Sequence, residues 1–255
     1  MEMAIFSQAL RDYLRPSRVL PWIALSGLCG LLALVWHFIQ PQSTTSEQYA
    51  WVSSILVFRR LALAAAIYTT SIISQEVEQR TIVYLVTRPV PRWKLLLIRY
   101  LASVIVVSLI GTVGVLVTSF GAFHTLGGNA LIANDLKAIV LGAFAYGALF
   151  LFISLIINRS MIVCLLFAFG WETSVPNMPG SMGNLSILTH LQAVSQHPAV
   201  QGEQNGLALI AGSLGTNSIS ADQAWGVMIA LTAVMLIASA YWFTNFEYVP
   251  REDAD

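Results

Sequence analysis

The sequence has little charge, few cysteines and no excess of either sign of charge, and each shortage excludes a class of protein. Charged residues make up 10% of the 255, well below the roughly 25% of an average soluble domain. The 13 basic residues balance the 13 acidic ones, which argues against a nucleic-acid partner. Cys29 and Cys164 lie in apolar runs and are expected to pack as small hydrophobic residues, so they indicate neither a disulfide framework nor a redox compartment.

Signatures of catalysis and metal binding are also missing. There is no G-x-x-x-x-G-K-[ST] loop to cradle nucleotide phosphates, no Gly-x-Ser-x-Gly nucleophile elbow and no cluster of Cys and His. His190 and His197 are seven residues apart, whereas two metal ligands on one helix are expected three or four apart. We therefore expect no catalytic residue and no metal site, and we expect both histidines at the surface.

Apolar residues are abundant and occur in long runs. They make up 56% of the chain, and the mean hydropathy is +0.71. About 20 apolar residues in a helix cross a hydrocarbon core of about 30 Å. The runs predict an all-α polytopic membrane protein, one transmembrane domain over 1–255, with six spans at residues 19–39, 57–75, 101–120, 138–157, 161–176 and 224–243.

Two regions outside the regular spans are expected to lie at the membrane surface. Apolar residues recur at helical spacing within 1–18 and polar residues fill the other side, which predicts an interfacial helix that ends at Pro16 and not a signal peptide. The fifth span breaks at Trp171 and Glu172, before Pro176, so a kinked or incomplete crossing leads into an outer segment, 177–223. That segment holds a possible second interfacial helix, marked by Leu185, Leu188, Leu191 and Val194.

The distribution of Lys and Arg predicts the orientation. With the N-terminus in the cytoplasm, ten of the 13 fall on the inner side, namely Arg11, Arg15, Arg18, Arg80, Arg88, Arg92, Lys94, Arg99, Arg159 and Arg251. Lys137 falls outside, and Arg59 and Arg60 lie near the outer boundary. Because cytoplasmic loops are enriched in Lys and Arg, both termini are expected in the cytoplasm.

The most highly charged stretch, 74–100, lies between the second and third spans on the cytoplasmic side. It contains seven of the 26 charged residues. Glu76 and Arg80 form a favourable i, i+4 pair, and Arg88 ends the predicted helix because Pro89 follows it. Composition alone is also compatible with an ordinary positively charged loop.

The order of residues in this stretch resembles the signature of the type-2 family of ATP-binding-cassette (ABC) transporter permeases. The matching residues are Glu76, Glu78, Thr81, Ile82, Leu85, Arg88, Pro89, Val90, Arg92 and Arg99. In that family an acidic pair is followed by a Gly-Thr-Leu step, a Pro-Val-(Ser/Pro)-Arg turn and a basic residue at the third span. Arg80 replaces the usual glycine here, and Arg99 stands where lysine is common. The six-span layout also resembles that family, so the resemblance covers nearly the whole chain.

The resemblance implies a permease subunit of the cytoplasmic (inner) membrane, of exporter type, that pairs with a second copy or a related subunit. A separate cytoplasmic ATPase subunit would bind ATP and Mg, and this chain would bind no cofactor. The segment 76–94 would be the cytoplasmic coupling helix and turn, against which the ATPase docks. The docking residues would be Glu76, Glu78, Arg80, Thr81, Arg88, Pro89 and Arg92.

Three charged residues lie in apolar surroundings and are candidates for a transport pathway. Arg59 and Arg60 fall one turn inside the outer boundary of the second span as predicted, where long side chains snorkel to the headgroups. The alternative is recognition of an acidic substrate or pairing with Glu172. Glu172 is either a helix-end residue or a polar element of the pathway.

Two further alternatives stay open from the residues alone. Ala143 and Gly147 form a small-xxx-small pair, which indicates close helix packing or a dimer seam. Besides transport, the chain could be an intramembrane enzyme or an assembly scaffold of a membrane complex. That function would require Arg59, Arg60, Glu172 and the two outer histidines to converge in space.

Overall fold

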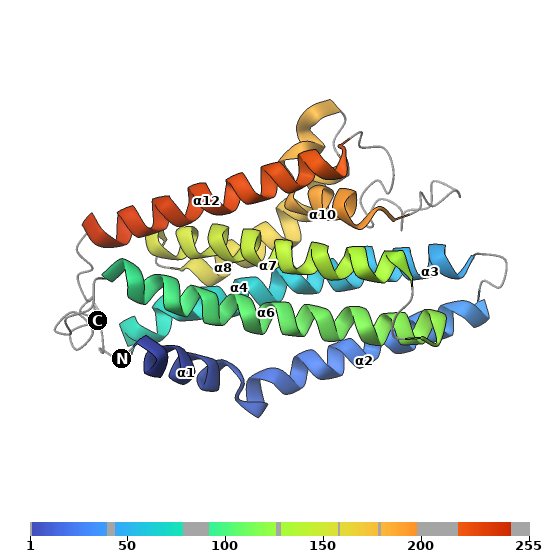
Figure 1. Ribbon diagram of the computed structural model, residues 1–255, viewed down its shortest axis with the longest axis horizontal. Coiled ribbons are helices and arrows are strands. Elements are labelled where there is room, and N and C mark those ends of the chain that lie inside the picture. The colour runs from blue at the N-terminus through green and yellow to red at the C-terminus, as the bar shows by residue number, and fades with distance from the viewer. Residues whose placement is uncertain are drawn as a thin grey trace.

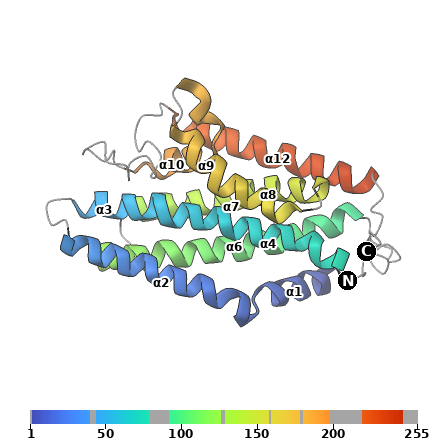
Figure 2. The ribbon, with the colours of Figure 1, turned by 180° about the vertical axis from the view of Figure 1, so that it is seen from behind.

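The computed structural model describes residues 2–39, 44–78, 92–125, 129–157, 159–177, 180–197 and 219–245 (Figure 1). Within these ranges every regular element is a helix, and the long helices run along one common axis (Figures 1 and 2). Five helical stretches are long and apolar enough to cross a membrane: Pro16–Trp36, Thr45–Ile72, Trp93–Phe123, Ala130–Ile156 and Ala221–Asn245. The prediction of an all-α polytopic membrane protein is confirmed.

The first two helices, α1 (Glu2–Tyr13) and α2 (Pro16–Ile39), are separated by a two-residue break. The break lies where the sequence predicted it, because Pro16 lacks an N–H and is best tolerated at the first position of a helix. Tyr13 at the end of α1 is buried, and its ring meets that of Tyr68 edge to face at 5.8 Å. The helix α1 therefore packs against the bundle through one face.

The second long helix begins earlier than the sequence predicted. It consists of α3 (Thr45–Val52), a π-helical turn η1 (Ser53–Val57) and α4 (Phe58–Glu78). Thr44 and Glu47 form a reciprocal capping box that fixes its start. The predicted span started at residue 57, whereas the helix begins at Thr45, so its N-terminal part is about 18 Å longer than expected.

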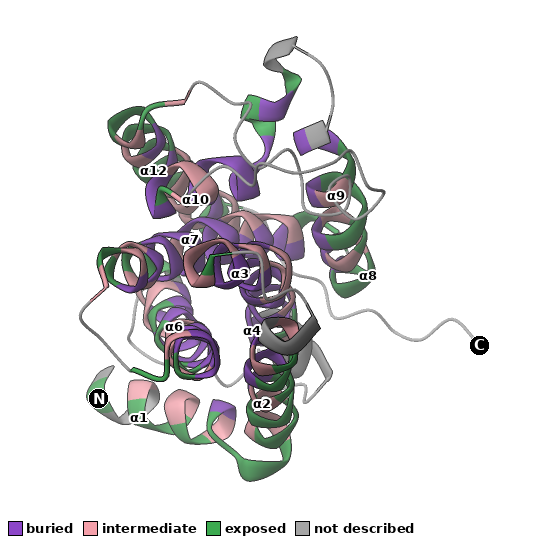
Figure 3. Cartoon of the chain, turned by 90° about the vertical axis from the view of Figure 1, so that its right-hand side faces the viewer, coloured by how far each residue is buried: buried purple, intermediate pink, exposed green. Residues whose placement is uncertain are grey.

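Two long helices, α6 (Arg92–Phe123) and α7 (Ala130–Ile156), form the middle of the bundle. The helix α7 packs against α4, α6, α10 and α12, and Figure 3, which views the bundle end-on, shows it with mostly buried residues. Asn129 caps the start of α7 by accepting a hydrogen bond from the Leu131 N–H at 3.1 Å. Between α6 and α7 the packing is close, because a Cβ on Gly147 would lie 3.1 Å from the ring of Tyr100.

The fifth predicted span is a short, irregular helix. It runs through α8 (Ser160–Leu166), a π turn η2 (Phe167–Trp171) and α9 (Glu172–Ser174). This apolar stretch, Ser160–Ser174, measures about 22 Å, which is less than the hydrocarbon core of about 30 Å. An irregular element was expected at 161–176, and the count of six spans stays a prediction.

After α9 the chain forms two short 3-10 turns, η3 (Val175–Asn177) and η4 (Gly180–Leu185), and then α10 (Ile187–Ser195). The sequence predicted a helix here that lies at the membrane surface; a helix is present, and its position at the membrane surface stays a prediction. Leu188, Leu191 and Val194 are at most 4% exposed, because α10 packs between α7 and α12 (Ala221–Asn245). The helix α10 therefore packs through this face against the bundle.

Candidate functional site

The charged coupling segment lies mostly outside the described residues. Glu76 and Glu78 belong to the last turn of α4, and Arg92 is the first residue of α6. Arg80, Thr81, Arg88 and Pro89 lie in 79–91, outside the described residues. The end of α4, the start of α6, the start of α1 and the end of α12 lie at the same end of the bundle (Figure 1).

Arg60 is buried in the bundle, 2% exposed, among α2, α4 and α6. Its Nη1 donates to the Ser26 hydroxyl at 2.5 Å, and its Nη2 donates to the Ile110 carbonyl at 3.1 Å. The prediction that Arg60 snorkels to the outer headgroups is therefore wrong. The helix begins at Thr45, so Arg60 lies about 22 Å along it instead of one turn inside the boundary.

Arg59 points to a different neighbour from Arg60. Its Nη1 donates to the Thr173 hydroxyl at 3.0 Å, which places the guanidinium beside Glu172 in α9. Consecutive residues on a helix point about 100° apart, so the two arginines face different helices. Of the predicted relationships, proximity of Arg59 to Glu172 is the one that the structure contains.

Glu172 is 1% exposed and binds the N-terminus of α10. Its carboxylate accepts from the Ser186 hydroxyl at 2.5 Å and from the backbone N–H groups of Ile187 and Leu188 at 3.1 and 3.0 Å. The first N–H groups of a helix lack partners within the helix and attract negative charge. Of the two interpretations left open by the sequence, the structure places Glu172 at a helix end, although the helix is α10 and not its own.

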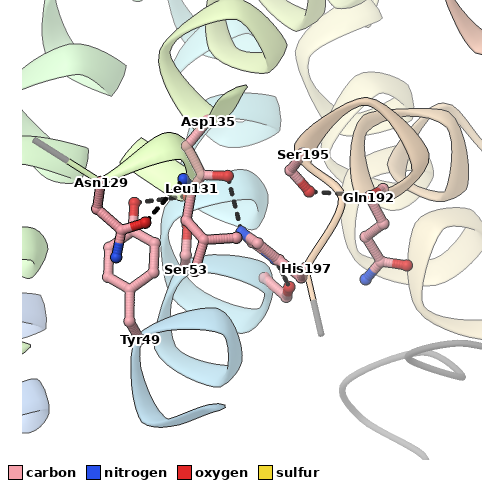
Figure 4. Close-up of polar contacts among 9 residues, drawn as sticks. Tyr49, Ser53, Asn129, Leu131, Asp135, Gln192, Ser195 and His197 are labelled. Atoms are coloured by element: carbon pink, nitrogen blue, oxygen red, sulfur yellow. Dashed lines mark hydrogen bonds and ion pairs between the residues drawn. The ribbon is translucent and has the colours of Figure 1, made fainter. Parts of the chain in front are cut away.

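A second buried polar cluster joins three distant parts of the chain (Figure 4). Asp135 of α7 accepts from the hydroxyls of Tyr49 and Ser53 at 2.7 and 2.6 Å, both at Oδ2. Its Oδ1 lies 2.7 Å from Nε2 of His197, which follows α10. The other ring nitrogen, Nδ1, lies 2.9 Å from the Ser54 hydroxyl. We call these five residues the Asp135 cluster.

No pattern in the sequence indicated the Asp135 cluster. The predicted spans left Tyr49, Ser53 and Ser54 in an outer loop, and they left Asp135 in the loop before the span at 138–157. Both helices begin earlier, so these residues lie inside the bundle. The capping box at Thr44 and Glu47 was the available signal, because it marks a helix start well before residue 57.

The surface positions expected for the two outer histidines are wrong. The His197 side chain is 2% exposed, and its ring stacks on Phe58 with centroids 5.8 Å apart. His190 is 5% exposed, and its Nδ1 lies 2.9 Å from the Ser186 carbonyl oxygen. The seven-residue spacing of His190 and His197 could not indicate whether they are buried, because burial depends on which other helices pack against them.

Ser54, His197 and Asp135 follow one another in the order of a Ser-His-Asp triad, but the ring nitrogens are exchanged: Nδ1 faces the serine and Nε2 the aspartate, whereas a triad has the serine at Nε2. A nucleophile needs access to substrate, whereas Ser54 and Asp135 are each 0% exposed. The residues required for an intramembrane enzyme converge only in part: Arg59 lies beside Glu172, and His190 contacts Ser186 as Glu172 does, whereas Arg60 contacts Ser26 and His197 contacts Asp135. The geometry thus favours packing and conformational roles for Ser54, His197 and Asp135.

A comparison with protein families gives a match over much of this architecture. The model of a family described as ABC-2 family transporter protein matches residues 14–171, more than half of the chain. The chain belongs to the ABC-2 transporter family. The match runs from the end of α1 to the end of η2, and it includes the charged segment and both arginines. None of the curated proteins compared with the chain matches it.

As an ABC-2 family member, the chain is an ABC transporter permease, a transport membrane subunit that is not itself an ATPase. The family resemblance recognised from residues 76–99 is confirmed. Membership in the family agrees with the apolar helices, and together they support a multi-pass membrane protein. The matched range ends at Trp171, so α10, α12 and His197 lie beyond it.

Proposed function

We propose that this ABC-2 permease moves a substrate across the cytoplasmic membrane with energy from ATP hydrolysis by a separate nucleotide-binding subunit. The observation that carries the proposal is the family match, which spans the charged segment between α4 and α6. ATP and Mg bind to the partner, and this chain pairs with a second permease subunit, either a copy of itself or a relative. Substrate moves outward, as in an exporter.

The docking surface for the ATPase comprises Glu76, Glu78, Arg80, Thr81, Arg88, Pro89 and Arg92. Support comes from the helices on either side, because α4 and α6 run from this segment into the core of the bundle. The buried Arg60 joins α4 to both α2 and α6. A force applied to the segment between α4 and α6 would therefore reach three helices at once.

Arg59 and Arg60 are the basic residues within the proposed pathway that an acidic substrate would meet. An intramembrane cation is costly, and it is a functional-site hypothesis by default. Arg60 has a hydroxyl and a carbonyl as hydrogen-bond partners, and no carboxylate ion-pairs with it among the described residues. Glu172 is a weaker pathway candidate, because α10 already occupies its carboxylate oxygens.

The test is affinity purification of the chain from its native membrane in mild detergent, followed by an ATPase assay of the bound proteins. We expect an ATPase to copurify with the wild type and to be lost with Glu78→Arg and with Arg88→Glu. Lys137→Glu is the matched control, because it reverses an exposed charge at the opposite end of the bundle. Copurification of the ATPase with both reversals would contradict the docking surface, and absence of any ATPase from the wild type would contradict the proposed function.

A further inference from the structure

The Asp135 cluster brings together two titratable groups that can share and exchange a proton. Asp135 is 0% exposed, and the His197 side chain is 2% exposed. Asp135 belongs to α7 and His197 follows α10, so the two residues are 62 positions apart in the sequence. A buried carboxylate beside a buried imidazole is costly to maintain unless both are paired, so their contact calls for an explanation beyond chance packing.

Both oxygens of the Asp135 carboxyl group are hydrogen-bonded. Tyr49 and Ser53 both donate to Oδ2, so that oxygen acts only as an acceptor. The remaining oxygen, Oδ1, lies 2.7 Å from Nε2 of His197, and one proton occupies this contact. The Asp135 carboxyl group is thus in contact with three polar side chains, those of Tyr49, Ser53 and His197.

The other side of the imidazole can be either a donor or an acceptor without movement of any heavy atom. When the ring is neutral, Nδ1 accepts the hydroxyl hydrogen of Ser54 at 2.9 Å. When the ring is protonated, Nδ1 donates to the Ser54 oxygen, and only the hydroxyl hydrogen rotates. The site is therefore hydrogen-bonded in both protonation states.

The net charge of the Asp135–His197 pair depends on whether the imidazole is protonated, because few other charged groups lie nearby. The titratable groups that face His197 are Asp135 from α7 and Tyr49 from α3, while α4 presents the apolar ring of Phe58. Among the described residues no other acid or base bonds to the pair. Lys137, two residues on, is exposed and donates to Asn134 at 3.5 Å. With imidazolium the pair has no net charge, whereas the neutral ring leaves one buried negative charge.

The backbone conformation at the end of α10 directs His197 into the bundle. Gln196 ends α10 in the left-handed region, with φ 51° and ψ 41°, which is uncommon for a residue other than glycine. This conformation turns the chain so that the next residue enters the bundle. The π turn at Ser53–Val57 brings Ser53 and Ser54, adjacent in sequence, to the same cluster, and such turns are frequent at functional sites.

We propose that Asp135 and His197 form a proton-binding site at the end of the bundle opposite the coupling segment. The bound proton joins three parts of the molecule, since Ser54 lies in η1, Asp135 in α7 and His197 after α10. Loss of the proton leaves the Asp135 charge uncompensated and weakens the attachment of the segment that carries α10. This inference concerns the chain alone and does not depend on a partner ATPase.

The test is a proton titration of the full chain in lipid nanodiscs, labelled with nitrogen-15 in the histidine rings. Spectra are recorded from about pH 5 to about pH 9, the range in which imidazole exchanges its proton. The chain has four histidines, so the His197 signal is identified as the one that vanishes in His197→Gln and persists in His190→Gln, whose ring contacts a backbone carbonyl, and this signal is expected to change with pH. In Asp135→Asn the same signal should report at least about tenfold weaker proton binding, a shift of one pH unit.

A second variant keeps the test decisive if the first ones fail to fold. Tyr49→Phe preserves the buried ring and removes one donor to the carboxylate, so the titration of His197 should move to higher pH, opposite to Asp135→Asn. A His197 signal that does not change across the range would overturn the proposal. So would a titration that neither Asp135→Asn nor Tyr49→Phe displaces, because the carboxylate would then take no part in proton binding.

Discussion

The guanidinium group of Arg60 occupies the space that a side chain on Gly114 would fill. Gly114 lies in α6, and the absence of a Cβ there lets Arg60 cross from α4 to the Ile110 carbonyl one turn earlier on α6. The Ser26 hydroxyl from α2 completes the contact. A small residue on one helix and a long cation on another thus determine how three spans pack.

Gly114→Ala is expected to destabilise the chain, because the added methyl overlaps the guanidinium of a closely packed side chain. Overpacking of this kind costs about 1–3 kcal/mol. The measurement is the thermal unfolding midpoint in detergent, with Gly226→Ala as the control, since nothing lies within 4 Å of a Cβ there. Combining Gly114→Ala with Arg60→Ala should cost less than the sum of the single changes, and strict additivity would contradict the contact.

Glu172→Ala is expected to loosen α10 from the bundle. The change removes an acceptor from two buried backbone N–H groups and from the Ser186 hydroxyl. Each buried donor left unpaired costs about 1–3 kcal/mol. Hydrogen exchange at residues 187–195 should speed up far more than in Asp222→Asn, which alters an exposed carboxylate at the start of α12. Unchanged exchange in α10 would show that Glu172 does not cap it.

Gly147→Val tests whether the small pair in α7 packs within the chain or between two copies. Within the chain, a Cβ on Gly147 would lie 3.1 Å from Tyr100 and 3.3 Å from Val104. The valine side chain would overlap these neighbours, so the unfolding midpoint should fall equally at low and high protein concentration. A loss that appears at high concentration and disappears at low concentration would instead indicate a dimer seam at this face, because only the associated wild type gains stability from a partner.

The predicted orientation can be measured with single cysteines at the two ends of the bundle. Lys137 in α7 and Arg11 in α1 are exposed, and the native Cys29 and Cys164 are buried. In intact cells a maleimide that cannot cross membranes should label Lys137→Cys, and it should label Arg11→Cys after the cells are opened. The reverse pattern would place the N-terminus outside and would contradict the orientation derived from the Lys and Arg count.

The sequence predicted the class of fold well and the starts of the helices less well. Apolar runs identify the spans because the bilayer requires about 20 such residues, as at Pro16–Trp36 and Ala221–Asn245. That criterion does not detect the starts of α3 and α7, because polar residues occur there. Glu47 and Asp135 were for this reason assigned to loops, although the one caps a helix and the other is buried.

The candidate site divides in the same way. Residues 76–99 identified the family because the order of charges and prolines there is local in sequence, and the family match confirms it. Glu172 could be recognised as unusual but not assigned, since its partner helix α10 begins 15 residues later. Whether a buried carboxylate serves a pathway or a helix end depends on which donors surround it, and those are set by tertiary contacts.

The sequence by itself determined that this chain is helical, crosses a membrane and carries the charged segment of an ABC-2 permease. Those properties depend on hydropathy summed over about 20 residues and on short-range order, both of which are written along the chain. The tertiary structure alone decided that Arg60 binds Ser26 and that His197 binds Asp135. These pairs lie 34 and 62 residues apart, and a contact at such separation depends on how whole helices pack, which no local pattern encodes.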